Sequence, residues 1–242
     1  MTDPVDRRPL AVVLLSGGMD SCVTAGIAAR DHELALLHVN YGQRTQRREL
    51  RAFEAIADHY LVSCRLVVDL PAIAHVGGSS LLAGGPAVPD AAFVEGQIPS
   101  TYVPFRNGQI LAVAAAWAEV LEAQAIYVGA VEQDSSGYPD CRRPFFDAYE
   151  RAIQLGTGAT SLLRIHTPLV ELSKAQIVRR GIDLGAPLHL TWSCYRDEDL
   201  ACGRCESCIL RLRGFAGAGV DDPVPYQDPA TGPGSTLPPR VD

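Results

Sequence analysis

The sequence of 242 residues contains no run of about 18 consecutive apolar residues, the length that a membrane-spanning helix needs. It also has no excess of positive charge: the formal net charge is −7, which argues against a protein that binds nucleic acid mainly through bulk charge. Residues 1–8 lack the pattern of a signal peptide, because Asp3 and Asp6 accompany Arg7 and Arg8 there and the apolar run at 10–15 is too short. We therefore expect a soluble cytoplasmic protein without a membrane partner or a stable nucleic acid partner.

Internal repeats are absent as well, and apolar segments instead alternate with segments of helical composition. This alternation is typical of an α/β domain. The apolar run at residues 10–15 has the composition of a strand buried on both faces, so we expect an open parallel sheet with helices on both faces. Strands are expected at 10–15, 34–39, 64–68, 125–129 and 162–165, and helices at 22–30, 45–60, 108–122, 145–155 and from 173.

Three parts of the chain differ in composition. Residues 9–186 carry the alternation and are expected to form the α/β domain. Residues 187–215 contain clustered cysteines and are expected to form a small metal-binding segment packed on it. Residues 216–242 are rich in proline, glycine and aspartate, which predicts a flexible tail. Residues 71–101 show no periodicity, which predicts a long loop that is either functional, such as a lid, or disordered.

A glycine-containing loop, Ser16-Gly17-Gly18-Met19-Asp20-Ser21, follows the first expected strand. Its glycines let backbone N–H groups approach an anion, and the next helix N-terminus attracts negative charge. The Ser16 and Ser21 hydroxyls can donate to phosphate oxygens. Asp20 either caps the helix or helps to hold a metal; the alternative is a tight turn with Asp20 or Ser21 as the N-cap. The loop matches neither the Walker A nor the Gly-x-Gly-x-x-Gly fingerprint.

A cysteine cluster lies near the C-terminus. Cys202, Cys205 and Cys208 are spaced by two residues each, and Cys194 precedes them by eight positions. Four thiols suit a tetrahedral zinc site, which is structural because no position is left for water. Disulfides, an iron–sulfur cluster and idle thiols are the alternatives, of which a reducing compartment disfavours disulfides.

Three further cysteines stand alone. Cys22 and Cys64 lie in apolar surroundings and are interpreted as core residues. Cys141 ends a polar loop beside Arg142 and Arg143, which can lower the pKa of its thiol. Nucleophilic catalysis by Cys141 is the less favoured interpretation, since no partner base is evident.

The glycine loop resembles the pyrophosphate loop, Ser-Gly-Gly-x-Asp-Ser, of the PP-loop ATP pyrophosphatases, which adenylate an oxygen of their substrate. Further motifs follow in a fixed order, and the ordered set resembles the QueC family of the queuosine pathway over about residues 10–213. The motifs are Val39-Asn40-Tyr41-Gly42-Gln43-Arg44, Tyr102-Val103-Pro104-Phe105-Arg106-Asn107, Ser136-Gly137-Tyr138-Pro139-Asp140-Cys141, Thr167-Pro168-Leu169 and Thr191-Trp192-Ser193-Cys194-Tyr195.

The resemblance implies a carbon–nitrogen ligase with a PP-loop fold, akin to the adenine nucleotide alpha hydrolases. Such an enzyme converts 7-carboxy-7-deazaguanine and ammonia to 7-cyano-7-deazaguanine through an adenylated acid and an adenylated amide. It implies ATP with Mg²⁺ as co-substrate, one structural Zn²⁺ per chain and a homodimer. The family's third motif usually has glycine where this chain has Phe105, and aspartate often stands where it has Asn40. Both departures concern the acceptor pocket.

Site residues are implied by the same resemblance. The ATP-binding set is Leu15, Ser16, Gly17, Gly18, Met19, Asp20 and Ser21, the catalytic set is Asp20, Arg106 and Lys174, and the substrate-binding candidates are Tyr41, Gln43, Arg44, Asn107, Glu132, Asp134, Tyr138 and Asp140. Cations can neutralise phosphate charge, and carboxylates can accept from the N–H edge of a deazapurine. The alternatives are a similar ligase acting on another acceptor, a tRNA-modifying PP-loop enzyme and a non-catalytic zinc-ribbon module.

Overall fold

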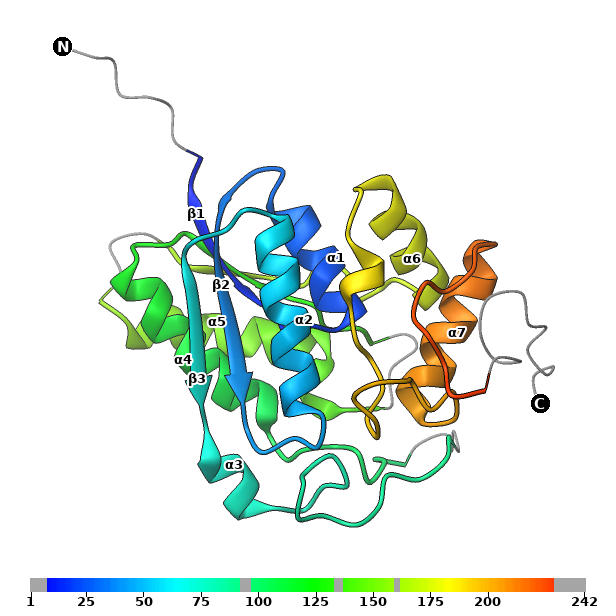
Figure 1. The fold of residues 1–242 in the computed structure, drawn as a ribbon. Helices are drawn as coiled ribbons and strands as arrows, with labels where there is room; N and C mark the ends of the chain where they lie inside the picture. The colour runs from blue at the N-terminus through cyan, green and yellow to red at the C-terminus, as the bar shows by residue number, and fades with distance from the viewer. Residues whose placement is uncertain (1–7, 92–96, 133–136, 159–161, 229–242) are drawn as a thin grey trace.

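The computed structural model describes residues 8–91, 97–132, 137–158 and 162–228, and the observations below concern these residues (Figure 1). The strands are β1 (Leu10–Leu14), β2 (Glu33–Asn40), β3 (Arg65–Asp69), β4 (Ala125–Val128) and β5 (Arg164–His166). The α-helices are α1 (Met19–Ala28), α2 (Gln46–His59), α3 (Pro71–Val76), α4 (Arg106–Val120), α5 (Arg143–Gly156), α6 (Lys174–Asp183) and α7 (Glu206–Ala218). Two short 3-10 helices are η1 (Pro139–Cys141) and η2 (Leu188–Leu190).

The five strands form one parallel sheet in the order β3-β2-β1-β4-β5. The chain leaves β1 toward β2 and later returns to place β4 on the other side of β1, so the order reverses between β1 and β4. In an open α/β sheet, ligands bind outside the carboxyl ends of the strands at this kind of reversal. The predicted fold class, an open parallel sheet with helices on both faces, is confirmed.

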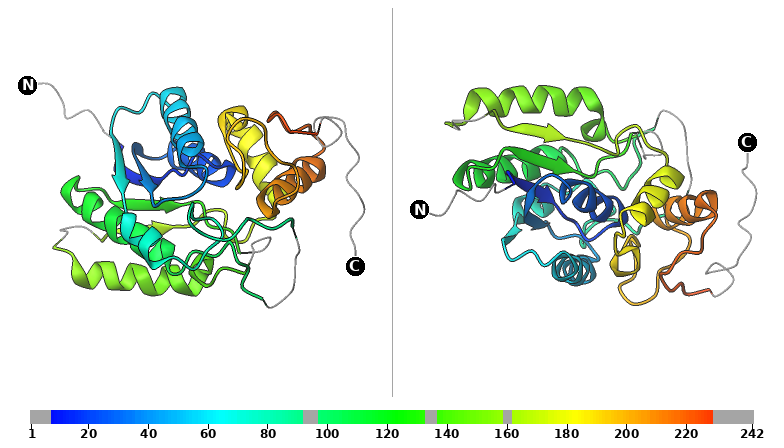
Figure 2. Two further views of the ribbon diagram at one scale, coloured as in Figure 1. Left: turned by 60° about the horizontal axis from the view of Figure 1, so that its bottom comes forward. Right: turned by 90° about the horizontal axis from the view of Figure 1, so that it is seen from above.

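Helices cover both faces of the sheet, with α1 and α2 on one side and α4 and α5 on the other (Figure 2). Alternate residues of β1 point to opposite faces, as the strand period requires. Val13 packs with Phe53 of α2, whereas Val12 packs with Leu111 of α4 and Phe146 of α5. Because both faces are buried, the central strands read as continuous apolar runs in the sequence.

The pair α6 and α7 lies beside the carboxyl end of the sheet (Figure 1). Ser173 caps α6 through a capping box with Gln176, which fixes where the helix begins. Gly214 of α7 lets the two helices approach closely, because a Cβ there would lie 2.9 Å from the Lys174 Cβ. Lys174, the first residue of α6, therefore lies directly against α7.

The sequence did not predict α7 as a helix, and its prediction of a flexible tail at 216–242 is wrong for residues 216–228. The helix α7 runs to Ala218, and Asp222, Val224 and Tyr226 are buried. The composition of this segment resembles a linker, but its polar groups pair with distant residues of the fold. Residues 229–242 lie outside the described residues.

The loop expected at 71–101 is partly ordered by α3 and by the burial of Leu81 and Leu82. Arg44 donates to the carbonyl oxygens of Ser80 and Gly85 at 2.8 and 2.6 Å, which fastens this stretch to the body of the protein. Within the ranges that the structure describes, no helix is long and apolar enough to cross a membrane.

Candidate functional site

The turn between β1 and α1 leaves the helix N-terminus open. The N-cap residue is Gly18, and no side chain caps it, so neither Asp20 nor Ser21 acts as the N-cap considered from the sequence. The Ser16 hydroxyl accepts from the Gly18 N–H at 3.2 Å and lies 3.1 Å from the Ser21 hydroxyl. Uncapped N–H groups and the helix dipole make such a turn suited to a phosphate.

Gly17 is the residue of this turn that tolerates no side chain. Its φ is +88°, and a Cβ would lie 2.5 Å from the backbone oxygen of Glu49 on α2. We expect Gly17→Ala to lower the free energy of unfolding by at least ~1–2 kcal/mol, from the left-handed conformation alone. Urea unfolding measures this change, with Gly84→Ala as the control because a Cβ at Gly84 meets nothing within 4 Å. Equal stability of the two variants would contradict the close packing of the turn on α2.

Asp20 and Lys174 form an ion pair next to the turn, with 2.6 Å between the carboxylate Oδ2 and the Lys174 Nζ. The other carboxylate oxygen of Asp20, Oδ1, is buried and accepts no hydrogen bond from the described residues. A buried carboxylate oxygen without a donor is costly unless a ligand or cation completes it. Lys174 is moreover the only lysine among the 21 Lys and Arg residues of the chain.

Arg106 and Asn107 stand at the start of α4, opposite the turn. Arg106 donates to the hydroxyl of the buried Tyr41 at 2.8 Å. The Asn107 backbone N–H donates to Asp140 Oδ2 at 2.9 Å, and its amide donates to the backbone oxygen of Asp140. The buried Asp140 therefore positions the start of α4 through Asn107.

Two adjoining cavities open at the carboxyl end of the sheet. The larger, about 260 Å³, is lined by the turn residues Ser16, Gly18 and Ser21 and by an apolar wall. The apolar wall consists of Leu37, Val39, Ile110 and Val128. The smaller, about 170 Å³, is lined by polar side chains that include Tyr138, Lys174 and Arg211. Nine residues line both cavities: Met19, Asp20, Arg106, Gly129, Ala130, Cys141, Ser193, Tyr195 and Ser207.

The predicted site residues separate into two groups. Leu15, Ser16, Gly18, Met19, Asp20, Ser21, Tyr41, Arg106, Asn107, Tyr138 and Lys174 line one or both cavities. Gly17, Gln43, Arg44, Glu132 and Asp140 line neither and contact other parts of the protein. Gln43 accepts from the Tyr41 N–H, for example, and Glu132 accepts from the Arg143 N–H. Asp134 lies outside the described residues.

Sequence reasoning missed Glu49, Tyr195 and Ser207, which also line the cavities. Glu49 accepts from Thr45 and Gln43, and burial raises the pKa of its carboxyl group. Burial likewise raises the pKa of the Tyr195 phenol, so it keeps its proton and stays a donor. Tyr195 and Ser207 each stand next to a clustered cysteine in the sequence, and no role was assigned to either side chain there.

Cys141 lies on the boundary between the cavities, but its thiol is not activated. Burial, and secondarily the neighbouring Asp140, raises its pKa to about 11, so only about one thiol in a thousand is ionised at pH 8. The Asn107 amide donates to its Sγ at 3.3 Å. We expect Cys141→Ser, which keeps an acceptor there, to change the turnover number by less than about threefold. A loss of about a hundredfold or more would instead indicate a nucleophile.

The four clustered cysteines come together at the start of α7. The Sγ atoms of Cys194, Cys202, Cys205 and Cys208 all lie within 4.8 Å of one another, and all four residues are buried. Backbone N–H groups of Arg196, Asp197 and Cys202 point at the Cys194 Sγ at 3.4 Å each. Four converging thiols with N–H donors around them can hold a metal ion, because thiolates are the ligand form.

This cluster is joined directly to the glycine turn. The Trp192 N–H, two residues before Cys194, donates to the backbone oxygen of Gly17 at 2.8 Å. Ser193, Tyr195 and Ser207, which line both cavities, come from the two segments that the cysteines hold. A metal bound there would therefore fix one wall of the site, to which Cys194 itself contributes.

Comparison with known proteins gives matches over nearly the whole chain. A family model described as "Queuosine biosynthesis protein QueC" matches residues 10–219. A 7-cyano-7-deazaguanine synthase of Chlorobium phaeobacteroides (strain DSM 266 / SMG 266 / 2430) is 53% identical over 218 residues, which cover 90% of this chain and 96% of that protein. One of Koribacter versatilis (strain Ellin345) is 55% identical over 220 residues, which cover 89% and 92%. Among solved structures, the NH3-dependent NAD synthetase of Campylobacter jejuni has a TM-score of 0.42 and 13% identity, covering 77% of this chain and 68% of that one.

Proposed function

The chain belongs to the QueC family, and we propose on this basis that its two cavities convert 7-carboxy-7-deazaguanine, ATP and ammonia into 7-cyano-7-deazaguanine. The chain is an ATP-dependent carbon–nitrogen ligase of queuosine biosynthesis. The proposal concerns how its residues perform this reaction. The acid must first be activated, because a carboxylate oxygen is a poor leaving group and adenylation makes it a good one.

One observation carries the assignment of roles: the phosphate-binding turn and the polar cavity meet at Asp20 and Arg106, which line both cavities. Adenylation requires the acid and the α-phosphate of ATP to be held in contact, in the orientation of attack. Two adjoining cavities with shared cationic and acidic walls provide this arrangement.

The larger cavity is suited to ATP. Its apolar wall of Leu37, Val39 and Ile110 suits a purine ring, and the open N-terminus of α1 suits the phosphates. We assign the ATP phosphates to Ser16, Gly18 and Ser21 and to the backbone N–H groups of the turn. Gly17 takes part by its positive φ rather than by lining the cavity.

The smaller cavity is suited to the deazapurine acid. Tyr138 is buried there and donates to the Thr101 hydroxyl at 2.9 Å, so its ring is held as a stacking wall. Tyr195 offers a protonated hydroxyl to the same space. Of the substrate-binding candidates, we retain Tyr41, Asn107 and Tyr138 as residues that line the cavities, and assign positioning roles to Gln43, Arg44, Glu132 and Asp140.

The reaction then proceeds in two activated stages. The carboxylate attacks the α-phosphate, pyrophosphate leaves, and ammonia displaces AMP to give the amide. The amide oxygen attacks the α-phosphate of a second ATP, pyrophosphate leaves again, and loss of AMP and of both protons on the amide nitrogen gives the nitrile. Lys174 and Arg106 neutralise the negative charge that develops on the phosphate, which is worth most where water is excluded.

Two metal ions complete the proposal. The chemistry of the donor set, four buried thiols, fits Zn²⁺ in a closed structural site held by Cys194, Cys202, Cys205 and Cys208. The partnerless oxygen of Asp20, Oδ1, fits a Mg²⁺ that accompanies ATP and shields its phosphates. One Zn²⁺ per chain and the use of Mg²⁺ are both parts of the proposal.

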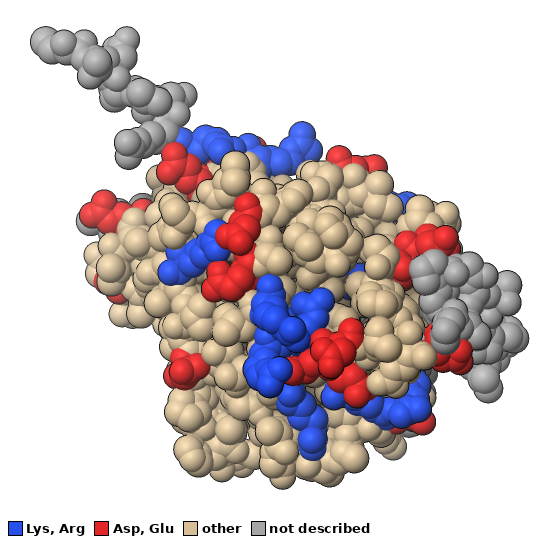
Figure 3. Space-filling model, in the orientation of Figure 1, with Lys and Arg blue, Asp and Glu red and all other residues tan. Residues whose placement is uncertain are grey.

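We propose small molecules rather than nucleic acid as partners. Figure 3 shows basic side chains gathered over α2, with acidic side chains directly beside them, rather than one unbroken basic face. Arg47 of α2, for example, lies 3.4 Å from Glu198.

The cytoplasmic location and the homodimer stay predictions. We retain residues 9–186 as the nucleotide-binding domain and 187–215 as the metal-binding segment.

Turnover tests the proposed function. The purified protein is incubated with 7-carboxy-7-deazaguanine, ATP, Mg²⁺ and ammonium, and the products are separated by mass spectrometry. We expect the nitrile, AMP and pyrophosphate, with no nitrile formed when ammonium is left out. Consumption of ATP without change in the acid would contradict the proposed acceptor, and ADP in place of AMP would contradict the adenylation.

A further inference from the structure

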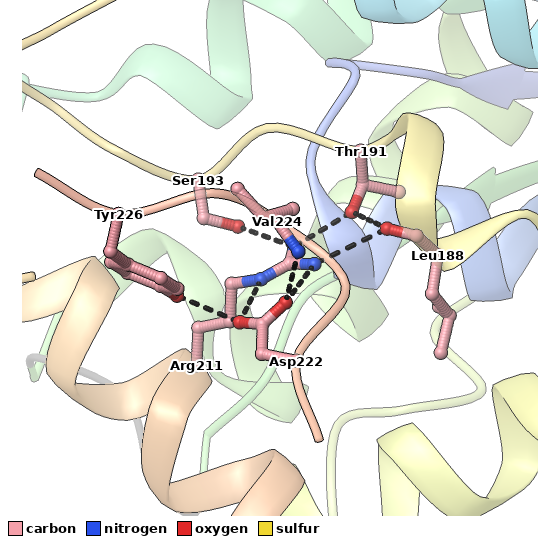
Figure 4. Close-up of polar contacts among 7 residues, drawn as sticks. All are labelled: Leu188, Thr191, Ser193, Arg211, Asp222, Val224 and Tyr226. Carbon is pink, nitrogen blue, oxygen red and sulfur yellow. Dashed lines mark hydrogen bonds and ion pairs between the residues drawn. The ribbon is translucent and has the colours of Figure 1, made fainter. Parts of the chain in front are cut away.

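A buried ion pair connects α7 to the segment that follows it (Figure 4). The Arg211 Nε lies 2.7 Å from Asp222 Oδ2, a second nitrogen of the guanidinium lies 2.9 Å from Oδ1, and both side chains are almost fully buried. Asp222 lies beyond residue 219, where the family match ends. The pair therefore joins the family-matched body to a segment outside it.

Arg211 has no capacity left for a substrate, although it lines the smaller cavity. A guanidinium carries five N–H donors, and here each has an acceptor. Besides Asp222, they reach the Thr191 hydroxyl at 2.7 Å, the Ser193 hydroxyl at 3.4 Å and the Leu188 backbone oxygen at 3.2 Å. Arg211 thus fixes the stretch that carries Trp192 and Cys194.

Asp222 is equally saturated. Besides Arg211, its carboxylate accepts from the Val224 N–H at 3.1 Å and from the Tyr226 hydroxyl at 2.7 Å (Figure 4). The four donors use both carboxylate oxygens as acceptors, whereas an amide in the same place has only one accepting oxygen. The segment is further anchored by Ala201, whose N–H donates to the Pro225 oxygen at 2.9 Å.

We propose that Asp222 is a positioning residue for the smaller cavity: it holds the Arg211 guanidinium in the orientation that fixes Thr191 and Ser193, and so sets the wall against which the acceptor binds. This inference rests on the proposed function, which assigns the acceptor acid to the smaller cavity. Arg211 itself lines the smaller cavity and not the larger one, so we expect Asp222 to affect the acceptor more than ATP.

The test compares Asp222→Asn with Asp221→Asn, the same change at its exposed neighbour. We expect Asp222→Asn to raise the KM for 7-carboxy-7-deazaguanine at least about tenfold, with the KM for ATP changed less than about twofold and the bound metal unchanged. Asp221→Asn should leave both KM values as they are. A parallel rise of both KM values, loss of the metal or an unchanged acceptor KM would overturn the proposal.

Tyr226→Phe removes only the hydroxyl that donates to Asp222, and it carries the test if Asp222→Asn does not fold. It should raise the acceptor KM in the same selective way, by a smaller factor. Absence of a selective rise would overturn the proposal.

Hydrogen exchange needs no turnover, so it tests this proposal separately from the proposed function. In Asp222→Asn, the amides of 188–194 should exchange faster while those of α4 do not, even if the wild-type protein leaves the acid unchanged. Unaltered exchange in 188–194 would overturn the proposal.

Discussion

Replacement of Lys174 by methionine is expected to lower the turnover number by roughly 10²–10³-fold, the cost of removing one charged group that stabilises a transition state. The methylene stem of methionine fills much of the same space, while the ammonium that lies 2.6 Å from Asp20 is lost. The KM for ATP should rise less than the turnover number falls, because the ammonium is proposed to interact more strongly with the charge redistributed on the α-phosphate in the transition state than with bound ATP.

Lys174→Arg distinguishes a specific role from mere positive charge. The side chain of Lys174 is 13% exposed, and α7 packs on its stem at Gly214. A planar guanidinium is larger and differently shaped than an ammonium, so we expect Lys174→Arg to lose at least about tenfold in turnover as well. Wild-type turnover in Lys174→Met would contradict the assignment of Lys174 to the reaction.

Because Lys174 is the only lysine, amine-directed labelling reports on it alone apart from the N-terminal amine. Bound ATP should protect Lys174 from acylation, as shown by the mass of the peptide that contains it. The N-terminal amine of the same sample is the internal control, since ATP should not change its labelling.

Loss of the metal ion proposed for the cysteine cluster is expected to lower turnover by a similar factor. We expect Cys205→Ser to lower the metal content at least about tenfold, because removing one of four thiolates opens a closed site. Turnover should fall by roughly 10²-fold, since Cys205 is the N-cap of α7 and the cluster holds Tyr195 and Ser207 in the cavity walls.

Cys64→Ser is the matched control for this prediction. Cys64 is partly exposed and lies outside the cluster, so its variant should keep both metal and turnover. Metal content is measured by elemental analysis of the purified proteins. Full turnover in a metal-free Cys205→Ser protein would contradict a structural role of the cluster in the site.

The sequence predicted the elements whose signals are local. The apolar run at 10–15 became β1, and the hexapeptide after it became the uncapped turn at the head of α1. The spacing of Cys202, Cys205 and Cys208 likewise predicted a cluster that the structure brings within 4.8 Å. In each case the physical requirement falls within a few neighbouring residues, so a pattern can reveal it.

Pairings between distant residues could not be predicted in this way. Asp20 and Lys174 were both singled out, but nothing local indicates that they form an ion pair. The burial of Asp222 was missed for the same reason. Its partner Arg211 belongs to α7, which was not predicted because the cysteine spacing indicated a metal-binding segment there. Arg44 was assigned to the substrate from its motif, whereas its guanidinium is taken up by backbone oxygens of the following loop.

The fate of the carboxyl oxygens tests the account most directly. The acid is prepared with ¹⁸O in both carboxyl oxygens and converted with unlabelled ATP, and the AMP and nitrile are counted by mass spectrometry. Adenylation of the acid and then of the amide predicts two AMP molecules per nitrile, each carrying one ¹⁸O. Unlabelled AMP, or ¹⁸O released as water or phosphate, would contradict the adenylation of both oxygens in these cavities.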